Sequence, residues 1–298
     1  MGIEFLSLDG YIKAKRYRLV NSVLVYENSD LVFERYYNNT DGNSRNQIKS
    51  VWKSILSLTL GACVDRGAIQ GIDEPICRFL PQFAQNIQPC RSAITIRDLL
   101  AMSSGIYWNG GIHYHCPMLE QMRRSKDWIG HIADVKAADY PGDRFAYKEW
   151  DVILLSAIIG RAWGSSSWDA CNECLYKPLG ISSEKWTQSA CGVDYPSWGA
   201  DASSDLTARD MAKIGLLMVG GGEWEGRRVI SGDYIKKAIS PSKAGYGFLF
   251  WLSDKGYHAR GFGGQELNVY PDKKIVAVVQ AKVTPSGKSY ADICGNII

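Results

Sequence analysis

KSVWKSILSLTLGACV, residues 49–64, is an almost wholly apolar run that begins with a serine, Ser50, and keeps a lysine, Lys53, one turn later. The spacing predicts a helix over residues 50–66. One narrow face of such a helix carries serine, lysine and glycine, at positions 50, 53, 54, 57 and 61. The other faces are apolar, so we expect a helix that is buried around most of its circumference.

Two interpretations of Ser50 and Lys53 fit this pattern. In the first, Ser50 caps the helix and Lys53 extends its ammonium group to water. In the second, Ser50 is a nucleophile, because a serine hydroxyl becomes reactive when a base takes its proton and Lys53 lies within reach. Partial burial then lowers the pKa of Lys53 toward the working pH. The free N–H groups of the helix N-terminus favour the negative charge that develops during attack.

The composition is that of a globular protein with one large domain or two ordinary ones. The chain has 298 residues, of which 46% are hydrophobic and 22% charged, so a sizeable core is expected and disorder is not. The net charge of +3 is too small to indicate nucleic acid or an anionic membrane as a partner. No stretch approaches about 20 uninterrupted apolar residues, so we expect no transmembrane helix.

The N-terminal segment and the cysteines favour a cytoplasmic protein. Residues 1–18 lack the basic-then-apolar order of a secretory signal. The eight cysteines are better explained as free thiols than as disulfides, because the chain is long and has an apparent core. We therefore expect a cytoplasmic location.

β-Structure is predicted at both ends of the chain, with helices between them. Residues 22–37 are typical of a β-hairpin, with a turn at ENSD, residues 27–30. Four further helices are predicted at residues 94–105, 127–135, 151–163 and 206–222, and three strands at residues 246–253, 266–271 and 274–283. The consistent assembly is an α+β fold, in which an antiparallel sheet from both chain ends is flanked by helices and receives an inserted, mostly helical region.

Six segments, in chain order, resemble the class C β-lactamase-related serine hydrolases, a family of penicillin-binding-protein-like esterases, amidases and D-aminopeptidases. They are residues 22–37, 50–69, 94–108, 141–159, 203–231 and 259–279, the fourth reading PGDRFAYKEWDVILLSAII and the sixth ARGFGGQELNVYPDKKIVAVV. The resemblance implies a β-lactamase/transpeptidase-like fold. Its α/β sandwich domain would comprise residues 1–72 and 200–298, its helical domain residues 73–199, and its active site would lie between them.

The resemblance also implies roles for individual residues, and it favours the second interpretation of Ser50. Ser50 would be the acylated nucleophile, and Lys53 would share its proton. Tyr147 corresponds to the tyrosine of the family's Y-x-N motif and would act as general base or proton relay. That role needs a nearby cation, because a free tyrosine has a pKa of about 10. The third family motif would fall on residues 259–261, and the N–H groups of Ser50 and Phe262 would form the oxyanion hole.

Two motif positions depart from the family pattern. Glu149 replaces the asparagine of Y-x-N and would either hold Lys53 charged or attract a substrate amine. Ala259 stands where the third motif has lysine or histidine, and Arg260 either supplies positive charge nearby or points to solvent. We therefore expect weak or absent β-lactamase activity, with acylation by simpler esters or amides retained.

The candidate substrate-binding residues are Glu149, Arg260, Gly261, Tyr107 and Trp108. Gly261 allows a strand to approach the substrate closely, and aromatic residues near the motifs suggest an apolar pocket. The expected substrate is a small ester, amide or peptide-like molecule. We expect no metal ion or other cofactor, and neither nucleic acid nor membrane as a partner.

Other functions stay open on the sequence alone. The two departures also fit a catalytically inactive binding protein that uses the same pocket. HYHC at residues 113–116 and CNEC at residues 171–174 contain residue types that bind zinc, but their separation is not a standard zinc spacing. The sequence has no G-x-S-x-G elbow, which weakens an α/β-hydrolase interpretation. His258 either lines the pocket or lies at the surface.

Overall fold

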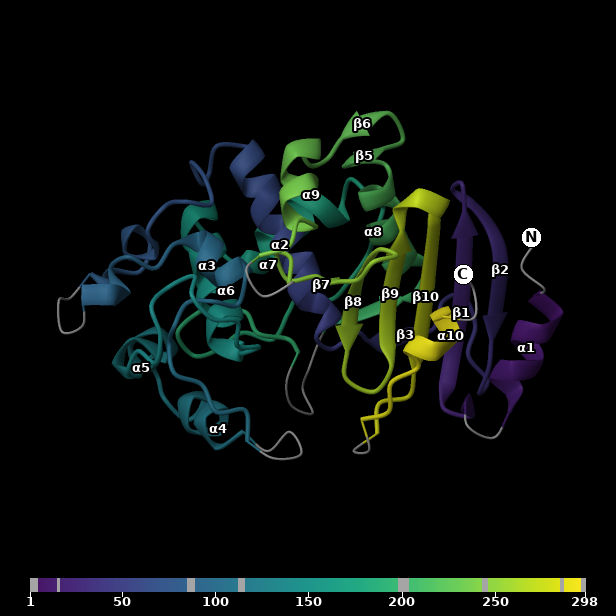
Figure 1. The fold of residues 1–298 in the computed structure, drawn as a ribbon, viewed down its shortest axis with the longest axis horizontal. Coiled ribbons are helices and arrows are strands. Elements are labelled where there is room, and N and C mark those ends of the chain that lie inside the picture. The colour runs from purple at the N-terminus through teal and green to yellow at the C-terminus, as the bar shows by residue number, and fades with distance from the viewer. Residues whose placement is uncertain are drawn as a thin grey trace.

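A six-stranded antiparallel sheet is the centre of the fold (Figure 1). The computed structural model describes residues 5–14, 17–84, 89–111, 116–197, 204–242, 246–284 and 287–295. The strand order is β2-β1-β10-β9-β8-β7, with bounds β1 Val20–Glu27, β2 Asp30–Tyr36, β7 Trp251–Leu252, β8 Tyr257–Gly261, β9 Gln265–Tyr270 and β10 Ile275–Ala281. Both ends of the chain therefore contribute strands to one sheet, which confirms the predicted α+β architecture.

Two short strand pairs lie outside this sheet. They are β3 Arg45–Gln47 with β4 Asp205–Thr207, and β5 Glu223–Trp224 with β6 Arg227–Arg228. The β1–β2 connection confirms the predicted hairpin. Its two central residues, Asn28 and Ser29, have φ values of 50° and 73°, the left-handed backbone that a tight hairpin turn requires. The predicted division into two domains stays a prediction.

Hydrophobic clusters cover both faces of the sheet. Along β10, Val276 and Val278 belong to one cluster, and Ala277 and Val279 to the other, because successive side chains of a strand point to opposite faces. The larger cluster includes helices α2 (Val51–Asp65) and α8 (Ala208–Val219). The smaller one includes α1 (Phe5–Lys13) and α10 (Ala291–Gly295). This double cover explains why every β10 residue is buried.

The predicted helices are all present, and most of them pack to one side of the sheet, with α2 in the centre of the molecule (Figure 1). The remaining ones are α3 Ile96–Leu100, α4 Pro117–Arg123, α5 Trp128–Asp134, α6 Glu149–Trp163, α7 Ser167–Cys171 and α9 Gly232–Ala238, with short 3-10 turns at η2 Ile76–Arg78, η3 Pro81–Phe83, η4 Pro89–Arg91 and η6 Pro271–Lys273 and a π-helical turn at η5 Asn172–Tyr176. None of the described helices combines the length and apolar character needed to cross a membrane.

The strand predicted over residues 246–253 is wrong in its extent, because only β7 is extended there. Leu249 has a φ of 61°, so the chain turns before β7. The N–H of Leu249 donates to the carbonyl of Leu100, 3.0 Å away, and its carbonyl accepts from the Ser54 hydroxyl at 2.6 Å. These contacts hold the segment against α2 and α3, and it does not lengthen the sheet edge.

Helix α2 is buried on every side, including its polar face. All residues from Val51 to Cys63 are buried, and Lys53 is 1% exposed. The hydroxyl of Ser57 lies 3.1 Å from that of Tyr234, a residue of α9. The Ser50 side chain makes no capping hydrogen bond. The interpretation in which Ser50 caps the helix and Lys53 reaches water is therefore wrong.

The Tyr234 ring of α9 packs against Gly61 of α2, and we predict that Gly61→Ala destabilises the protein. A Cβ at this position would lie 2.4 Å from the Tyr234 ring, a contact that cannot persist without movement of a buried side chain. Overpacking of this kind costs about 1–3 kcal/mol in the free energy of unfolding, measured by denaturant titration.

Gly10→Ala in α1 is the matched control for this prediction. Apart from the backbone of α1 itself and the two neighbouring residues, no atom of the described residues lies within 4 Å of a Cβ at Gly10. Alanine should therefore stabilise that helix by about 0.5–1 kcal/mol through its better helix propensity. Equal effects of the two substitutions would contradict the steric explanation.

Candidate active site

Ser50 lies immediately before α2, at a constrained position of the backbone. The preceding residue, Lys49, has a φ of 50°, which is uncommon for a residue with a Cβ atom and tends to occur at functional sites. The Ser50 hydroxyl does not cap the helix, and it accepts a hydrogen bond from Lys53 Nζ at 2.9 Å. The serine and lysine of the opening segment are therefore in direct contact.

Lys53 joins Ser50 to a buried carboxylate. Its ammonium group also donates to Glu149 Oε1 at 2.9 Å, and it lies 5.3 Å from the centre of the Tyr147 ring. The second carboxylate oxygen, Oε2, accepts a hydrogen bond from the Tyr195 hydroxyl at 2.7 Å. Both oxygens of Glu149 are thus held by side chains from other parts of the chain.

The pKa of Lys53 is raised above its ordinary value. Burial alone lowers this pKa, but the charge of Glu149 and the interactions with Glu149 and Tyr147 together outweigh the loss of solvent. The expectation that burial moves the pKa of Lys53 down toward neutrality is therefore wrong. The partner that reverses the shift is Glu149, so the alternative in which this residue holds Lys53 charged agrees with the structure.

Tyr147 is positioned by an aromatic residue that the sequence did not single out. Its ring stacks on Trp251 of β7, with ring centres 5.4 Å apart and planes 24° from parallel. Trp251 in turn makes an edge contact with Tyr246, at 4.9 Å. The aromatic run of residues 246–251 was the available signal for this contact, whereas nothing in the sequence indicated Tyr195.

A cavity of about 420 Å³ brings the motif residues together. It is lined by Ser50, Tyr147, Trp251, Arg260, Gly261, Phe262, Gly263, Gly264, Glu266, Gly287, Lys288 and Ser289. Five of the residues predicted from the sequence therefore share one cavity. Glu149 contacts Lys53 and is not among the described residues that line the cavity. Tyr107 and Trp108 are not among them either.

Gly261 lets strand β8 approach the segment that leads into α2. A Cβ on this residue would lie 2.2 Å from the carbonyl oxygen of Ile48, so only glycine fits without a shift of the backbone. The turn that follows contains Gly263 and Gly264, with φ values of 83° and 91°. The predicted oxyanion hole, formed by the N–H groups of Ser50 and Phe262, stays a prediction.

Arg260 and Glu266 form an ion pair in the same cavity. They are direct neighbours on β8 and β9, with Arg260 Nε 3.2 Å from Glu266 Oε2. Burial raises the pKa of Glu266 to about 7, although Arg260 and a hydrogen bond from Ser289 oppose this shift. Arg260 is 42% exposed, so it lines the cavity and reaches solvent as well.

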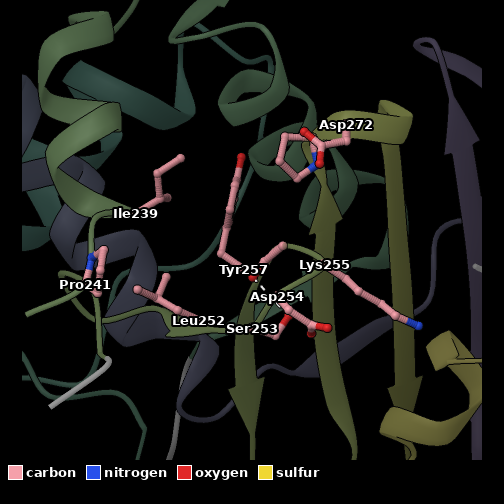
Figure 2. Close-up of a pocket in the computed structure, with 10 residues that line it drawn as sticks. Ile239, Pro241, Leu252, Ser253, Asp254, Lys255, Tyr257 and Asp272 are labelled. Atoms are coloured by element: carbon pink, nitrogen blue, oxygen red, sulfur yellow. Dashed lines mark hydrogen bonds between the residues drawn. The ribbon is translucent and has the colours of Figure 1, made fainter.

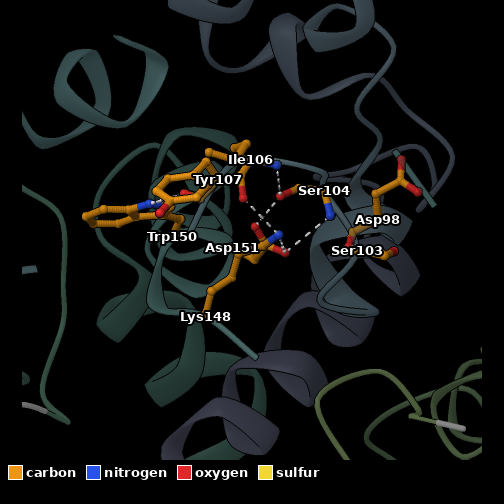
Figure 3. Close-up of polar contacts among 8 residues, drawn as sticks. All are labelled: Asp98, Ser103, Ser104, Ile106, Tyr107, Lys148, Trp150 and Asp151. Carbon is orange, nitrogen blue, oxygen red and sulfur yellow. Dashed lines mark hydrogen bonds and ion pairs between the residues drawn. The ribbon is translucent and has the colours of Figure 1, made fainter. Parts of the chain in front are cut away.

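A buried polar network fixes the start of α6 (Figure 3). Its member Lys148 lies between Tyr147 and Glu149 in the sequence. Asp151 accepts hydrogen bonds from the Ser104 hydroxyl at 2.6 Å and lies 3.7 Å from the ammonium of Lys148. Lys148 also donates to the carbonyl of Ile106 at 3.4 Å. Burial raises the pKa of Asp151 to about 6. The segment around residues 104–106 is thereby attached to α6.

Tyr107 and Trp108 belong to this supporting region. The carbonyl of Tyr107 accepts a hydrogen bond from Trp150 Nε1 at 3.2 Å (Figure 3). Trp108 contacts Trp150 edge to face, with ring centres 4.8 Å apart. Both residues therefore pack against the start of α6, and their predicted role in substrate binding has no support from the cavity lining.

A second cavity, of about 460 Å³, lies at the opposite end of β8 (Figure 2). Its walls come from the end of α9, the β7–β8 turn and η6, and include Ile239, Leu252, Tyr257 and Asp272. It contains none of the motif residues around Ser50. We therefore place the candidate active site in the smaller cavity.

His258 is buried beside the β7–β8 turn. Its Nε2 lies 2.9 Å from the Ser253 hydroxyl and its Nδ1 2.6 Å from Asn268 Oδ1. It is 6% exposed, so the prediction of a surface histidine is wrong. It is also not among the described residues that line the Ser50 cavity, so the alternative prediction of a pocket residue is wrong as well. Among the described residues no group of acidic, histidine and cysteine side chains could hold a metal ion. His113 and His115 lie outside the described residues.

Comparison with known proteins identifies the family. The sequence profile of the Beta-lactamase family matches residues 8–293. The chain belongs to the Beta-lactamase family. The 6-aminohexanoate-dimer hydrolase of Paenarthrobacter ureafaciens is 24% identical over 231 residues, which cover 74% of this chain and 57% of that protein. The chain spans about three fifths of the length of the curated relatives it matches.

Solved structures confirm the β-lactamase/transpeptidase-like fold. A protein from Bacteroides dorei DSM 17855 superposes with a TM-score of 0.81 at 18% identity, covering 99% of this chain and 98% of that one. The penicillin-binding protein from Bacillus halodurans gives a TM-score of 0.75 at 19% identity, covering 97% and 98%. The predicted resemblance to penicillin-binding-protein-like serine hydrolases is thereby confirmed.

We predict that Glu266→Gln changes the pH dependence of stability. The folded-state pKa of Glu266 lies above its ordinary value of 4.5, so the folded protein binds more protons than the unfolded chain between pH 4.5 and about 7. Stability from this group is present below pH 4.5 and is lost as the pH rises through about 7. Glu266→Gln removes this pH-dependent loss of stability. The change that it causes in the free energy of unfolding should therefore be more stabilising at pH 8 than at pH 4.5, by up to about 3 kcal/mol.

Denaturant titrations at the two pH values measure this difference. Glu27→Gln, at an exposed position at the end of β1, is the control and should give the same small effect at both. An effect of Glu266→Gln that does not depend on pH would contradict the raised pKa.

Proposed function

We propose that this chain is a serine hydrolase that forms an acyl-enzyme on Ser50 and then hydrolyses it, acting on an ester or amide bond. The observation that carries the proposal is the 2.9 Å contact of Lys53 Nζ with the Ser50 hydroxyl at the edge of a cavity that also contains Tyr147. Family membership supports it, since the relatives in the comparison include a 6-aminohexanoate-dimer hydrolase.

Each residue of the site has a proposed role. Ser50 Oγ attacks the substrate carbonyl, and Lys53 handles the proton that Oγ loses. Tyr147 serves as general base or as proton relay to the leaving group. The N–H groups of Ser50 and Phe262 stabilise the oxyanion, an effect that commonly contributes about 3–4 kcal/mol to the activation free energy. Water then releases the acyl group.

The cavity favours small substrates other than β-lactams. Trp251 and Phe262 provide apolar surface, while Arg260 and Lys288 provide positive charge at the opening. The family's asparagine, which would bind a β-lactam amide, is replaced by a glutamate that is occupied by Lys53 and Tyr195. Ala259 is buried and offers no charge. We therefore infer an ester, amide or peptide-like substrate.

A fluorophosphonate probe should label the native chain at Ser50. We expect a mass increase of one probe per chain for the native protein and none for Ser50→Ala, measured by intact-mass spectrometry. Ser253→Ala is the matched control and should label normally, because the Ser253 hydroxyl also lies beside a basic nitrogen, that of His258. No labelling of the native protein would favour an inactive binding protein with the same pocket.

We predict that β-lactams are poor substrates of this protein. In a panel of p-nitrophenyl esters, D-amino-acid amides and a chromogenic cephalosporin, we expect Ser50-dependent turnover of an ester or amide. The cephalosporin should be slower by at least about 100-fold, because a site that lacks the required hydrogen-bond donor leaves a polar substrate group unpaired. Turnover of the cephalosporin at a rate equal to that of the best ester would contradict this prediction.

A further inference from the structure

We propose that Glu149 is the final acceptor of the Ser50 proton, with Lys53 passing the proton between them and Tyr195 positioning the carboxylate. The proposal rests on the proposed function and assigns the base of its first step. Three contacts link these groups in a line. They are Ser50 Oγ to Lys53 Nζ at 2.9 Å, Lys53 Nζ to Glu149 Oε1 at 2.9 Å, and Tyr195 hydroxyl to Glu149 Oε2 at 2.7 Å.

Lys53 cannot act as the base without help, because it is held as an ammonium. Lys53 is 1% exposed, its ammonium group is paired with Glu149, and its pKa is raised. A protonated amine has no lone pair with which to take a proton from Ser50. It must first give a proton to another group, and Glu149 Oε1 is an ionised acceptor at hydrogen-bond distance.

Tyr147 is a weaker candidate for this step. A tyrosine acts as a base only when nearby positive charge stabilises its phenolate. The cation next to Tyr147 is Lys53, and the charge of Lys53 is already compensated by Glu149. Ionising Tyr147 would place a second anion beside the first, with one ammonium between them. The carboxylate already occupies the position beside the ammonium, with its second oxygen held by Tyr195, so a phenolate would have to compete with it for one cation.

The proposed transfer moves one proton from Ser50 to Glu149 and leaves the charge of Lys53 unchanged. Lys53 gives one proton to Glu149 Oε1 and takes the proton of Ser50 Oγ, so it is an ammonium before and after the step. The Oγ electron pair forms a bond to the substrate carbonyl carbon, and the π pair of the carbonyl moves to its oxygen. When the tetrahedral intermediate collapses, the bond to the leaving group breaks. For a poor leaving group, the proton returns from Glu149 through Lys53, with Tyr147 as the relay.

Tyr195 is a positioning residue and acts only through Glu149. Its ring is fixed in the core by edge contacts with Trp52 and Trp128, at 5.8 and 6.1 Å between ring centres. Burial and the neighbouring Glu149 raise its pKa well above 10, so it is a neutral phenol that donates to the carboxylate. This hydrogen bond turns Oε1 toward Lys53. Among the described residues, the titratable groups that interact with Glu149 are Lys53, Tyr195, Cys116 and Tyr246, and Tyr147 interacts with Lys53.

The test compares Glu149→Gln with Tyr147→Phe on p-nitrophenyl acetate. The p-nitrophenolate leaving group needs no proton, so the assay isolates the removal of the Ser50 proton. Glu149→Gln keeps the size of the side chain but replaces the carboxylate that would take up the proton with a neutral amide. We therefore expect acylation to slow by about 100-fold or more. The acid limb of its pH–rate profile should disappear. Tyr147→Phe should slow the same reaction by no more than about tenfold.

Tyr195→Phe provides a graded variant. It should lower kcat by about five- to twentyfold with little change in KM, because one hydrogen bond to a charged group is lost while the substrate cavity is untouched. A merely structural role for Tyr195 would lower the melting temperature and leave the pH–rate profile of the remaining activity in place, whereas positioning predicts a shifted acid limb.

Two results would overturn the proposal. A loss of 100-fold or more in Tyr147→Phe, with Glu149→Gln close to the native rate, would assign the base to the tyrosine. Labelling of Glu149→Gln by the fluorophosphonate probe at the native rate would remove the need for a carboxylate acceptor. These outcomes differ from failure of the proposed function, in which the native chain itself is neither labelled nor active.

Discussion

The buried ammonium of Lys53 is the interaction that organises the site. A charged amine removed from water is strongly destabilising unless an opposite charge and hydrogen-bond acceptors surround it. The protein meets this requirement with Ser50 from the same helix, Glu149 from α6 and the nearby ring of Tyr147. Because these groups come from different segments, the ammonium can be accommodated only when α2 and α6 are in their final arrangement. The position of Ser50, the proposed nucleophile, is thereby coupled to the fold.

Close packing around α2 supplies the precision that this site needs. Gly261 allows β8 to lie against the residue that precedes Lys49, and Gly61 allows α9 to pack on the other end of the helix. The hydroxyl of Ser54 holds the turn at Leu249, which leads directly into β7 and Trp251. The polar face of α2 that begins at Ser50 therefore also provides packing contacts, at Ser54 and Gly61.

Periodicity and turn chemistry predicted the sheet, the hairpin and α2, because these features are encoded in neighbouring residues. Motif spacing predicted that Ser50, Tyr147 and Gly261 would meet, and the cavity brings them together. Contacts that depend on tertiary structure were not predictable in this way. Tyr195 carries no local signal, and aromatic residues near a motif say nothing about direction, so Tyr107 and Trp108 were assigned to a cavity that they do not line.

The replacement of asparagine by Glu149 was visible in the sequence, but its meaning depends on what its two oxygens contact. An exposed carboxylate in this position would attract a substrate amine, the second of the alternatives considered for it. In the structure one oxygen accepts a hydrogen bond from Lys53 and the other from Tyr195, so both oxygens are engaged by groups of the protein itself. In the proposed function, substrate recognition would then come from the residues that line the cavity, among which Arg260, Glu266 and Lys288 are ionisable. In the proposed mechanism, residue 149 therefore acts on the proton of Ser50 and not on the substrate.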